Sequence, residues 1–437
     1  MNSEFLSSIV HFLRFPHAVG ATESSMRRVE RPIWSWSHRA WARHIGVLDR
    51  VGLSLPLYAR LLESGEHTRL PAETLAAFEK RKRDNSERML GMLQTFGQAI
   101  SALQQSGVQH VCVKGFSLFP DYHEDPWQRH QTDFDLLVPP ADALRAQRTL
   151  EGLGYKLTEV AGDGERRLRI PATEYFNRNT YLYRPQKSAA IELHPRFWEP
   201  GAEELPLRCP DNAFEQAEMR TLGSVSFLGL SRPHAFLYQT LHVFRHFLGS
   251  WARLLWLYEI AAYLHRFQED DALWQQVQAL ASTDARLSEA IALVLLTAQD
   301  LFACPIPRAL QVVHTLPAKS PVRLWISHFA RRWLLADIPG NKLNLLLQRH
   351  FFSDGPTWRR YLASRLVPFG KHSSLCEGID RSIAKSFSFR AANCRFQAGR
   401  CWHHLHTGVG YATASIVWKM YLHRSQASYP QVNCFDN

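Results

Sequence analysis

The chain has 437 residues, 46% of them apolar and 21% charged, and its 51 Lys and Arg exceed its 40 Asp and Glu to give a formal net charge of +11. This apolar content excludes a chain that is disordered throughout, and seven cysteines at irregular spacing, with no Cys-x-x-Cys unit, exclude a small disulfide scaffold. No apolar run approaches the roughly 20 residues of a membrane-spanning helix, so we expect a cytoplasmic protein with no transmembrane segment.

The N-terminal region, residues 1–84, is expected to be helical. Apolar side chains recur every three or four residues between Leu48 and Leu62, and a longer periodic stretch runs from Pro71 to Gly107. Basic residues over 80–83 interrupt the apolar stripe of that stretch, and we interpret them as a solvated helix face.

Between residues 85 and 200 the apolar period changes from helical to extended, which predicts an α+β core with a small mixed sheet. The expected elements, in chain order, are a strand over 108–113, a strand over 132–138, a helix over 141–152 and a hairpin formed by 180–183 and 189–194. Helices are then expected to pack on this sheet.

The remaining chain is expected to form a helical domain over 201–316 and a basic, aromatic-rich helical extension over 317–437. The clearest helical segments of the former are 235–248, 251–267, 271–280 and 286–302. Mostly helical regions are therefore predicted on both sides of the mixed-sheet core.

Two acidic residues on one predicted strand are the first candidates for metal ligands. Side chains two positions apart point to the same face of a strand, so Asp133 and Asp135 would present their carboxylates side by side. Such a pair favours a bound cation, and Mg²⁺ prefers oxygen ligands. Glu192, on another predicted strand, would supply a third carboxylate. On spacing alone, an edge strand with two solvent-facing acids is the simpler interpretation, and the order of the elements is what favours a metal site.

A candidate phosphate-binding turn precedes these acids. Lys114 and Gly115 lie at the end of the first predicted strand. A glycine there lets the backbone approach a phosphate, and a lysine offers it a positive charge.

Residues 111–155, which include VCVKGFS and TDFDLLV, together with IELHPRFW at 191–198, resemble a bacterial family of uncharacterised nucleotidyltransferases in the polymerase-beta-like superfamily. That family shows a Lys-Gly turn, an Arg shortly before Asp-x-Asp-Leu-Leu-Val, a helix ending in Gly-Tyr and a later Glu-Leu-His. The resemblance covers about residues 85–265. Within it, Glu259 stands where the family usually has an Asp, and the turn is Lys-Gly where other members of the superfamily have Gly-Ser.

The resemblance implies a transferase that moves a nucleoside monophosphate from a nucleoside triphosphate such as ATP to an unidentified acceptor hydroxyl, with release of pyrophosphate. It implies two Mg²⁺ ions during catalysis. The residues that match the family pattern are Asp133, Asp135 and Glu192 for metal binding and catalysis, Lys114, Gly115, Ser117 and Arg129 for the phosphates, and His194 in a supporting role.

Two alternatives to nucleotidyl transfer remain open. One is a non-catalytic binding module that keeps this fold and holds RNA, an anionic polymer or a partner protein. The other is transfer of a terminal phosphate at the same site.

Two groups of histidines and cysteines have spacings that metal sites use. His242 and His246 are four apart, but Val243 occupies the position of the glutamate in zinc proteases, which favours a structural role. Cys394 and Cys401 lie near His403, His404 and His406, but the gap between the two cysteines is wider than zinc sites normally use.

The basic charge is concentrated near the C-terminus. Residues 319–437 contain 17 Lys and Arg against 5 Asp and Glu, whereas residues 1–318 carry a net charge of −1. Interleaved aromatic residues suit contacts with RNA, an anionic membrane surface would also fit, and an ordinary helical subdomain with a basic face needs no partner.

Overall fold

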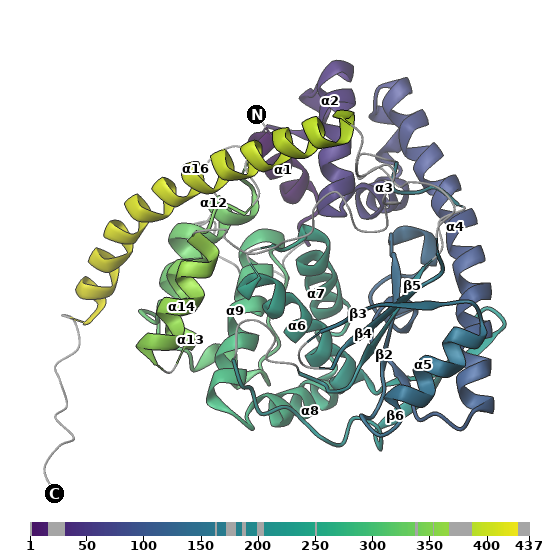
Figure 1. Cartoon of the computed structure of the whole chain (residues 1–437). Helices are drawn as coiled ribbons and strands as arrows, with labels where there is room; N and C mark the ends of the chain where they lie inside the picture. The colour runs from purple at the N-terminus through teal and green to yellow at the C-terminus, as the bar shows by residue number, and fades with distance from the viewer. Residues whose placement is uncertain are drawn as a thin grey trace, which may run out of the picture.

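The computed structural model describes residues 2–15, 31–161, 164–171, 181–185, 189–198, 205–249, 251–336, 340–352, 354–366 and 387–426. Helices predominate in this part of the chain, and a seven-stranded mixed sheet lies between two helical layers (Figure 1). The α+β class with helical flanks, predicted from the sequence, is confirmed.

The sheet has the strand order β3-β4-β5-β2-β1-β7-β6. Its central strands β2 and β5 run parallel, with Asp135 opposite Glu192 and Leu137 opposite His194. β1 is antiparallel to β2 and parallel to β7, so the sheet is mixed. The strands are β1 (Val111–Cys112), β2 (Asp133–Leu137), β3 (Lys156–Val160), β4 (Arg166–Arg169), β5 (Ala190–His194), β6 (Ala217–Leu222) and β7 (Val225–Leu230).

One face of the sheet is closed by α4 (Ala72–Gln105) and α5 (Ala143–Gly152). Phe96 of α4 lies 5.2 Å, centroid to centroid, from Phe134 of β2 and 5.1 Å from Phe227 of β7. Successive side chains of a strand point to opposite faces of the sheet. Since Phe134 faces α4, Asp133 and Asp135 of β2 point to the opposite face.

A second helical layer, which includes α6 (Arg232–Leu248) and α7 (Leu254–Arg266), packs on that opposite face, as Figure 1 shows. Their core is continuous with that of the N-terminal helices: Phe5 and Trp41 belong to the same buried cluster as Phe236 and Trp274. The other helices of this layer are α1 (Asn2–Phe12), α2 (His38–Val51), α3 (Ser54–Glu63), α8 (Asp271–Ala281) and α9 (Ala285–Phe302).

The described part of the C-terminal region is helical, as predicted, and α16 (Phe387–Gln426) projects at the edge of the molecule (Figure 1). Before it come α10 (Gln311–His314), α11 (Pro321–Trp325), α12 (Arg331–Leu334), α13 (Asn344–Phe351) and α14 (Gly355–Leu366). A π-helical turn over Ile326–Ala330 joins α11 to α12.

The predicted helices over 141–152, 235–248, 251–267, 271–280 and 286–302 are confirmed with small shifts of their ends, as are strands within 108–113, 132–138 and 189–194. The predicted hairpin of 180–183 with 189–194 is wrong: residues 181–183 form no strand, and position 180 lies outside the described residues. The antiparallel neighbour of β5 is β4 instead.

The sequence analysis missed four strands, and three of them, β3, β4 and β6, have side chains too polar or too exposed to alternate clearly. β3 is almost wholly exposed, and β4 is Arg-Arg-Leu-Arg, in which only Leu168 is buried. β6 and β7 lie in the segment predicted to be helical, and they meet at a turn where Gly223 has a φ of +58°, a conformation that favours glycine. Through β7 the sheet thus continues past residue 200.

Candidate active site

The parallel pairing of β2 with β5 gathers acidic side chains on one face. Asp135 and Glu192 are register partners, so their carboxylates leave the sheet side by side, and His194 follows two positions later on the same face. The residues between them, Phe134, Leu136, Ile191 and Leu193, face the core on the other side of the sheet.

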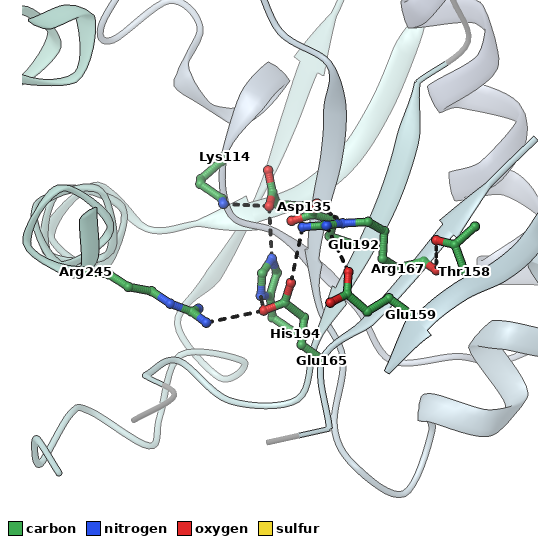
Figure 2. Close-up of polar contacts among 9 residues, drawn as sticks. All are labelled: Lys114, Asp135, Thr158, Glu159, Glu165, Arg167, Glu192, His194 and Arg245. Atoms are coloured by element: carbon green, nitrogen blue, oxygen red, sulfur yellow. Dashed lines mark hydrogen bonds and ion pairs between the residues drawn. The ribbon is translucent and has the colours of Figure 1, made fainter. Parts of the chain in front are cut away.

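Asp135 is the centre of this cluster (Figure 2). Its Oδ1 lies 2.6 Å from Lys114 Nζ and 2.9 Å from His194 Nε2. Asp135, Glu192 and His194 are all buried, and one ligand atom of each lies within 4.8 Å of the others. In the described part of the chain, this is the one group of three or more His, Cys, Asp or Glu residues arranged so closely.

Asp133 lines the same cavity but differs from Asp135 in its surroundings. Among the described residues its carboxylate has no hydrogen-bond or ion-pair partner within direct reach. The pKa of Asp133 is raised, first by burial and second by the negative charge of Asp135. This carboxylate is therefore the one most open to an incoming cation.

The other two carboxyls respond to their neighbours in opposite ways. Burial alone would raise the pKa of Asp135, but the charge of Lys114 and the hydrogen bond from His194 outweigh it and lower the pKa. The pKa of Glu192 is raised by burial and by repulsion from Asp135 and Asp133, although Arg167 Nε donates to its Oε1 at 2.6 Å. We call the line along which β2 and β5 pair the seam. Protein cations thus balance the negative charge of its acids only in part.

The Lys114-Gly115 turn reaches the acids from the end of β1. Gly115 has a φ of +65°, and a Cβ placed there would lie 3.0 Å from the side-chain oxygen of Gln131, so the turn requires glycine. Lys114 lines the cavity, but Ser117 does not. The Ser117 hydroxyl is buried and donates to the Lys114 carbonyl at 3.3 Å.

Arg129 also lines the cavity, and a buried acid holds it there. Arg129 Nε donates to Glu259 Oε1 at 2.6 Å, and Glu259 also accepts hydrogen bonds from His123 at 2.9 Å and Gln239 at 2.8 Å. Burial opposes ionisation of Glu259, yet Arg129 and His123 lower its pKa. Glu259 thereby fixes the position of the guanidinium.

Three further charged residues, which the sequence analysis did not find, complete the site. Arg167 pairs with Glu192, and Arg245 of α6 lies 3.5 Å from Glu165, which in turn is 3.8 Å from His194 Nδ1 (Figure 2). These residues come from β4, α6 and the loop before β4, and no local motif marks them. Only the tertiary fold brings them to the seam.

The cavity in front of the seam has a volume of about 330 Å³. The acidic side chains of β2 and β5 form its floor, and basic side chains line it around them. We call the group of His242, His246, Trp251 and Trp256 the aromatic wall. The lining side chains are Asp133, Asp135, Glu165 and Glu192, then Lys114, Arg129, Arg167, Arg245 and Arg253, then His242, His246, Trp251 and Trp256, with His130, Gln131, Thr132 and His194 between them.

The aromatic wall includes the histidine pair noted in the sequence. His246 stacks on Trp256 with a centroid distance of 4.1 Å, and His242 contacts both rings edge-on. Burial, followed by the charge of Lys114, lowers the pKa of His246 to about 3, so this ring is neutral. Trp251 remains half exposed at the mouth of the cavity, edge-on to Trp256.

The donor atoms at the seam fit a divalent metal ion. Carboxylate oxygens from Asp133, Asp135 and Glu192 suit Mg²⁺ or Mn²⁺. The pKa values of Asp133 and Glu192 are raised first by burial and then by repulsion between the carboxylates, and a bound cation relieves that repulsion. His194 either adds a nitrogen ligand or holds the Asp135 carboxylate by a hydrogen bond, as metal ligands are commonly held.

Comparison with known protein families places the chain among the nucleotidyltransferases. The model of a family described as "Uncharacterised nucleotidyltransferase" matches residues 37–303, more than half of the sequence, and the chain belongs to this family. The resemblance inferred from the sequence is confirmed, and the match begins well before residue 85. No curated protein and no solved structure matches the chain. None of the described helices combines the length and apolar character needed to cross a membrane.

Proposed function

We propose that this protein transfers a nucleoside monophosphate from a nucleoside triphosphate to an acceptor hydroxyl in a Mg²⁺-dependent reaction. In that reaction the acceptor oxygen forms a bond to the α-phosphorus, the bond to the β-phosphate bridging oxygen breaks, and pyrophosphate leaves. The observation that carries the proposal is the pairing of Asp135 with Glu192 at the floor of a cavity rich in arginine.

Asp133, Asp135 and Glu192, which line the same cavity, would hold the metal, with His194 orienting Asp135. When bound, the one or two Mg²⁺ ions supply positive charge to the reacting phosphate and lower the pKa of the acceptor hydroxyl. No separate protein base is then needed to take the proton of the acceptor hydroxyl.

The triphosphate would be bound by the cations around the acids. Arg129 is held in place by Glu259, Lys114 reaches the floor of the cavity, and Arg253 lies beside Trp251 at its mouth. Fixed cations in a partly buried site stabilise the charge of a departing pyrophosphate more effectively than solvated ones. Trp251 offers its exposed ring for stacking with the nucleobase.

The test is transfer of label from each of the four α-³²P nucleoside triphosphates, with Mg²⁺, in cell extract supplemented with the pure protein. We expect label in a defined acceptor, and no transfer by the Asp133→Asn/Asp135→Asn variant. The matched control is Glu218→Gln, an exposed acid on edge strand β6 of the same sheet. Transfer by the double variant at the wild-type rate contradicts the proposal, and transfer of γ-label alone would establish phosphoryl transfer instead.

A second candidate is the non-catalytic binding module. The ion pairs Lys114–Asp135 and Arg167–Glu192 favour it, because protein cations already neutralise two of the three acids. The absence of label in any acceptor, together with undetectable triphosphate binding in calorimetry, would support this candidate.

A further inference from the structure

Helix α16 is attached to the rest of the protein along one side. Ala414 and Trp418 are buried in the main core, where Trp418 contacts Phe329 edge-on at 5.9 Å. One turn further, Tyr421 stacks on His328 at 3.9 Å. Lys342 Nζ donates to the backbone carbonyl of His404 at 3.0 Å. These contacts define an inner face that extends over most of the described side chains of the helix.

The opposite side of α16 carries a second apolar face. It consists of five large residues that recur at intervals of three, four or seven positions and are 49 to 70% exposed. At 3.6 residues per turn they fall within about 60° of one another, on the side away from the buried residues. We call Trp402, Leu405, Val409, Ile416 and Met420 the outer stripe.

The charge of the helix is entirely of one sign. Residues 387–426 contain five Lys and Arg, four His and neither Asp nor Glu. Arg395, Lys419 and Arg424 are exposed and project at the sides of the outer stripe. An exposed apolar stripe between basic residues, with no acids, is the pattern of a helix that lies in the plane of a membrane surface.

We propose that the outer stripe of α16 binds the surface of an anionic lipid bilayer. Its aliphatic and aromatic side chains would enter the boundary between headgroups and acyl chains, with Trp402 at the level that tryptophan prefers. Arg395 and Lys419 would contact the lipid phosphates. The inference does not depend on the proposed transfer reaction.

Charge argues against the other occupants of this face. A second copy of the chain would bring two helices together that both carry only positive charge, and like charges in close contact oppose association. RNA would meet the basic residues, but Leu405, Val409 and Ile416 have no planar group on which a base could stack. An anionic bilayer satisfies both the apolar stripe and its basic borders.

The test is co-sedimentation of the full chain with vesicles of phosphatidylcholine, alone or with about 30 mol% phosphatidylglycerol. We expect binding to the anionic vesicles and weaker binding at higher salt. Leu405→Glu/Ile416→Glu should weaken binding at least about tenfold, because two apolar side chains no longer enter the bilayer. The matched control is Leu90→Glu, since Leu90 of α4 is 65% exposed and Leu405 is 63% exposed.

A second variant separates charge from apolar contact. Arg395→Gln/Lys419→Gln should weaken binding to anionic vesicles about fivefold for each cation removed, about 25-fold in all, and reduce its dependence on salt. Failure of the wild-type chain to bind anionic vesicles overturns the proposal. Unchanged binding by the Leu405→Glu/Ile416→Glu variant also overturns it. A third contradicting result is a wild-type chain that forms a dimer and does not bind vesicles, with a monomeric Leu405→Glu/Ile416→Glu variant, since the outer stripe would then bind a second copy of the chain.

Discussion

The cavity and α16 use the same number of cationic side chains in opposite ways. Five Lys and Arg line the cavity beside four Asp and Glu, whereas the five Lys and Arg of α16 have no acid on the same helix. In the cavity, ion pairs such as Lys114–Asp135 and Arg129–Glu259 bury and orient the cations. Paired, buried cations can hold a substrate in one geometry, whereas solvated ones attract an anionic surface of any pattern.

The largest expected effect comes from removing a cavity cation. Lys114→Met should lower nucleotidyl transfer about 10²- to 10³-fold, because a fixed positive charge beside the reacting phosphates is lost. Lys156→Met is the control, since Lys156 is exposed on edge strand β3. Steady-state transfer rates measure the effect, and equal loss in both variants would show that position in the cavity does not matter.

Next in size is the loss of the acid that holds Arg129. Glu259→Gln leaves a buried guanidinium without its partner, which should lower the free energy of unfolding by about 3 kcal/mol. Urea denaturation measures this loss. Glu269→Gln, at an exposed acid just beyond α7, should cause almost none.

The same pair predicts a dependence on pH. The pKa of Glu259 is lowered from its ordinary value of 4.5 in the folded protein, so its contribution to stability is present above that value and is lost as the pH falls toward the folded pKa. The free energy of unfolding should therefore fall on acidification below about pH 4.5 more steeply in the wild type than in Glu259→Gln. Parallel pH profiles would contradict this assignment.

Two exposed tryptophans sharpen the comparison. Trp251→Ala should weaken nucleotide binding about tenfold and leave vesicle binding unchanged, because Trp251 lies at the mouth of the cavity. Trp402→Ala should weaken vesicle binding and leave nucleotide binding unchanged, because Trp402 lies on the outer stripe of α16. Calorimetry with a non-hydrolysable triphosphate and vesicle co-sedimentation measure both properties, and a variant that lost both would remove the distinction between the regions.

The smallest effect is expected from the cations of α16 on folding. Arg395→Gln/Lys419→Gln should change the free energy of unfolding by less than about 0.5 kcal/mol, because exposed charges contribute little to stability. Transfer activity should also be unchanged. A larger loss of stability in urea denaturation would mean that these cations pair within the protein.

Sequence reasoning succeeded where burial imposes a clear pattern. β2 and β5 are buried, and their apolar patterns predicted two strands, with Asp133 and Asp135 on one face of the first and Glu192 on the second. The register that sets Glu192 opposite Asp135 comes from the structure. β3, β4 and β6 are edge or polar strands whose residues carry little apolar signal. For the same reason, the hairpin partner of β5 was assigned to the wrong segment.

The candidate site was predicted only where its residues are local in sequence. The Lys-Gly turn and the acids follow one another in a recognisable order, and the structure brings Lys114 and Asp135 into contact. Arg167, Arg245 and Glu165 reach the cavity from distant segments, so no spacing reveals them. Ser117 was expected from the family pattern to bind phosphate, but its hydroxyl donates to the Lys114 carbonyl, and Ser117 does not line the cavity.

The central claim is that the acids of the β2–β5 seam bind a divalent cation for nucleotidyl transfer. Electron paramagnetic resonance of Mn²⁺, titrated into the protein with and without a nucleoside triphosphate, tests it most directly. We predict bound Mn²⁺ in the wild type, displaced by excess Mg²⁺, and a large loss of binding in Asp133→Asn and Glu192→Gln but not in Glu218→Gln. Free Mn²⁺ in all samples, or equal binding by all variants, would contradict the account.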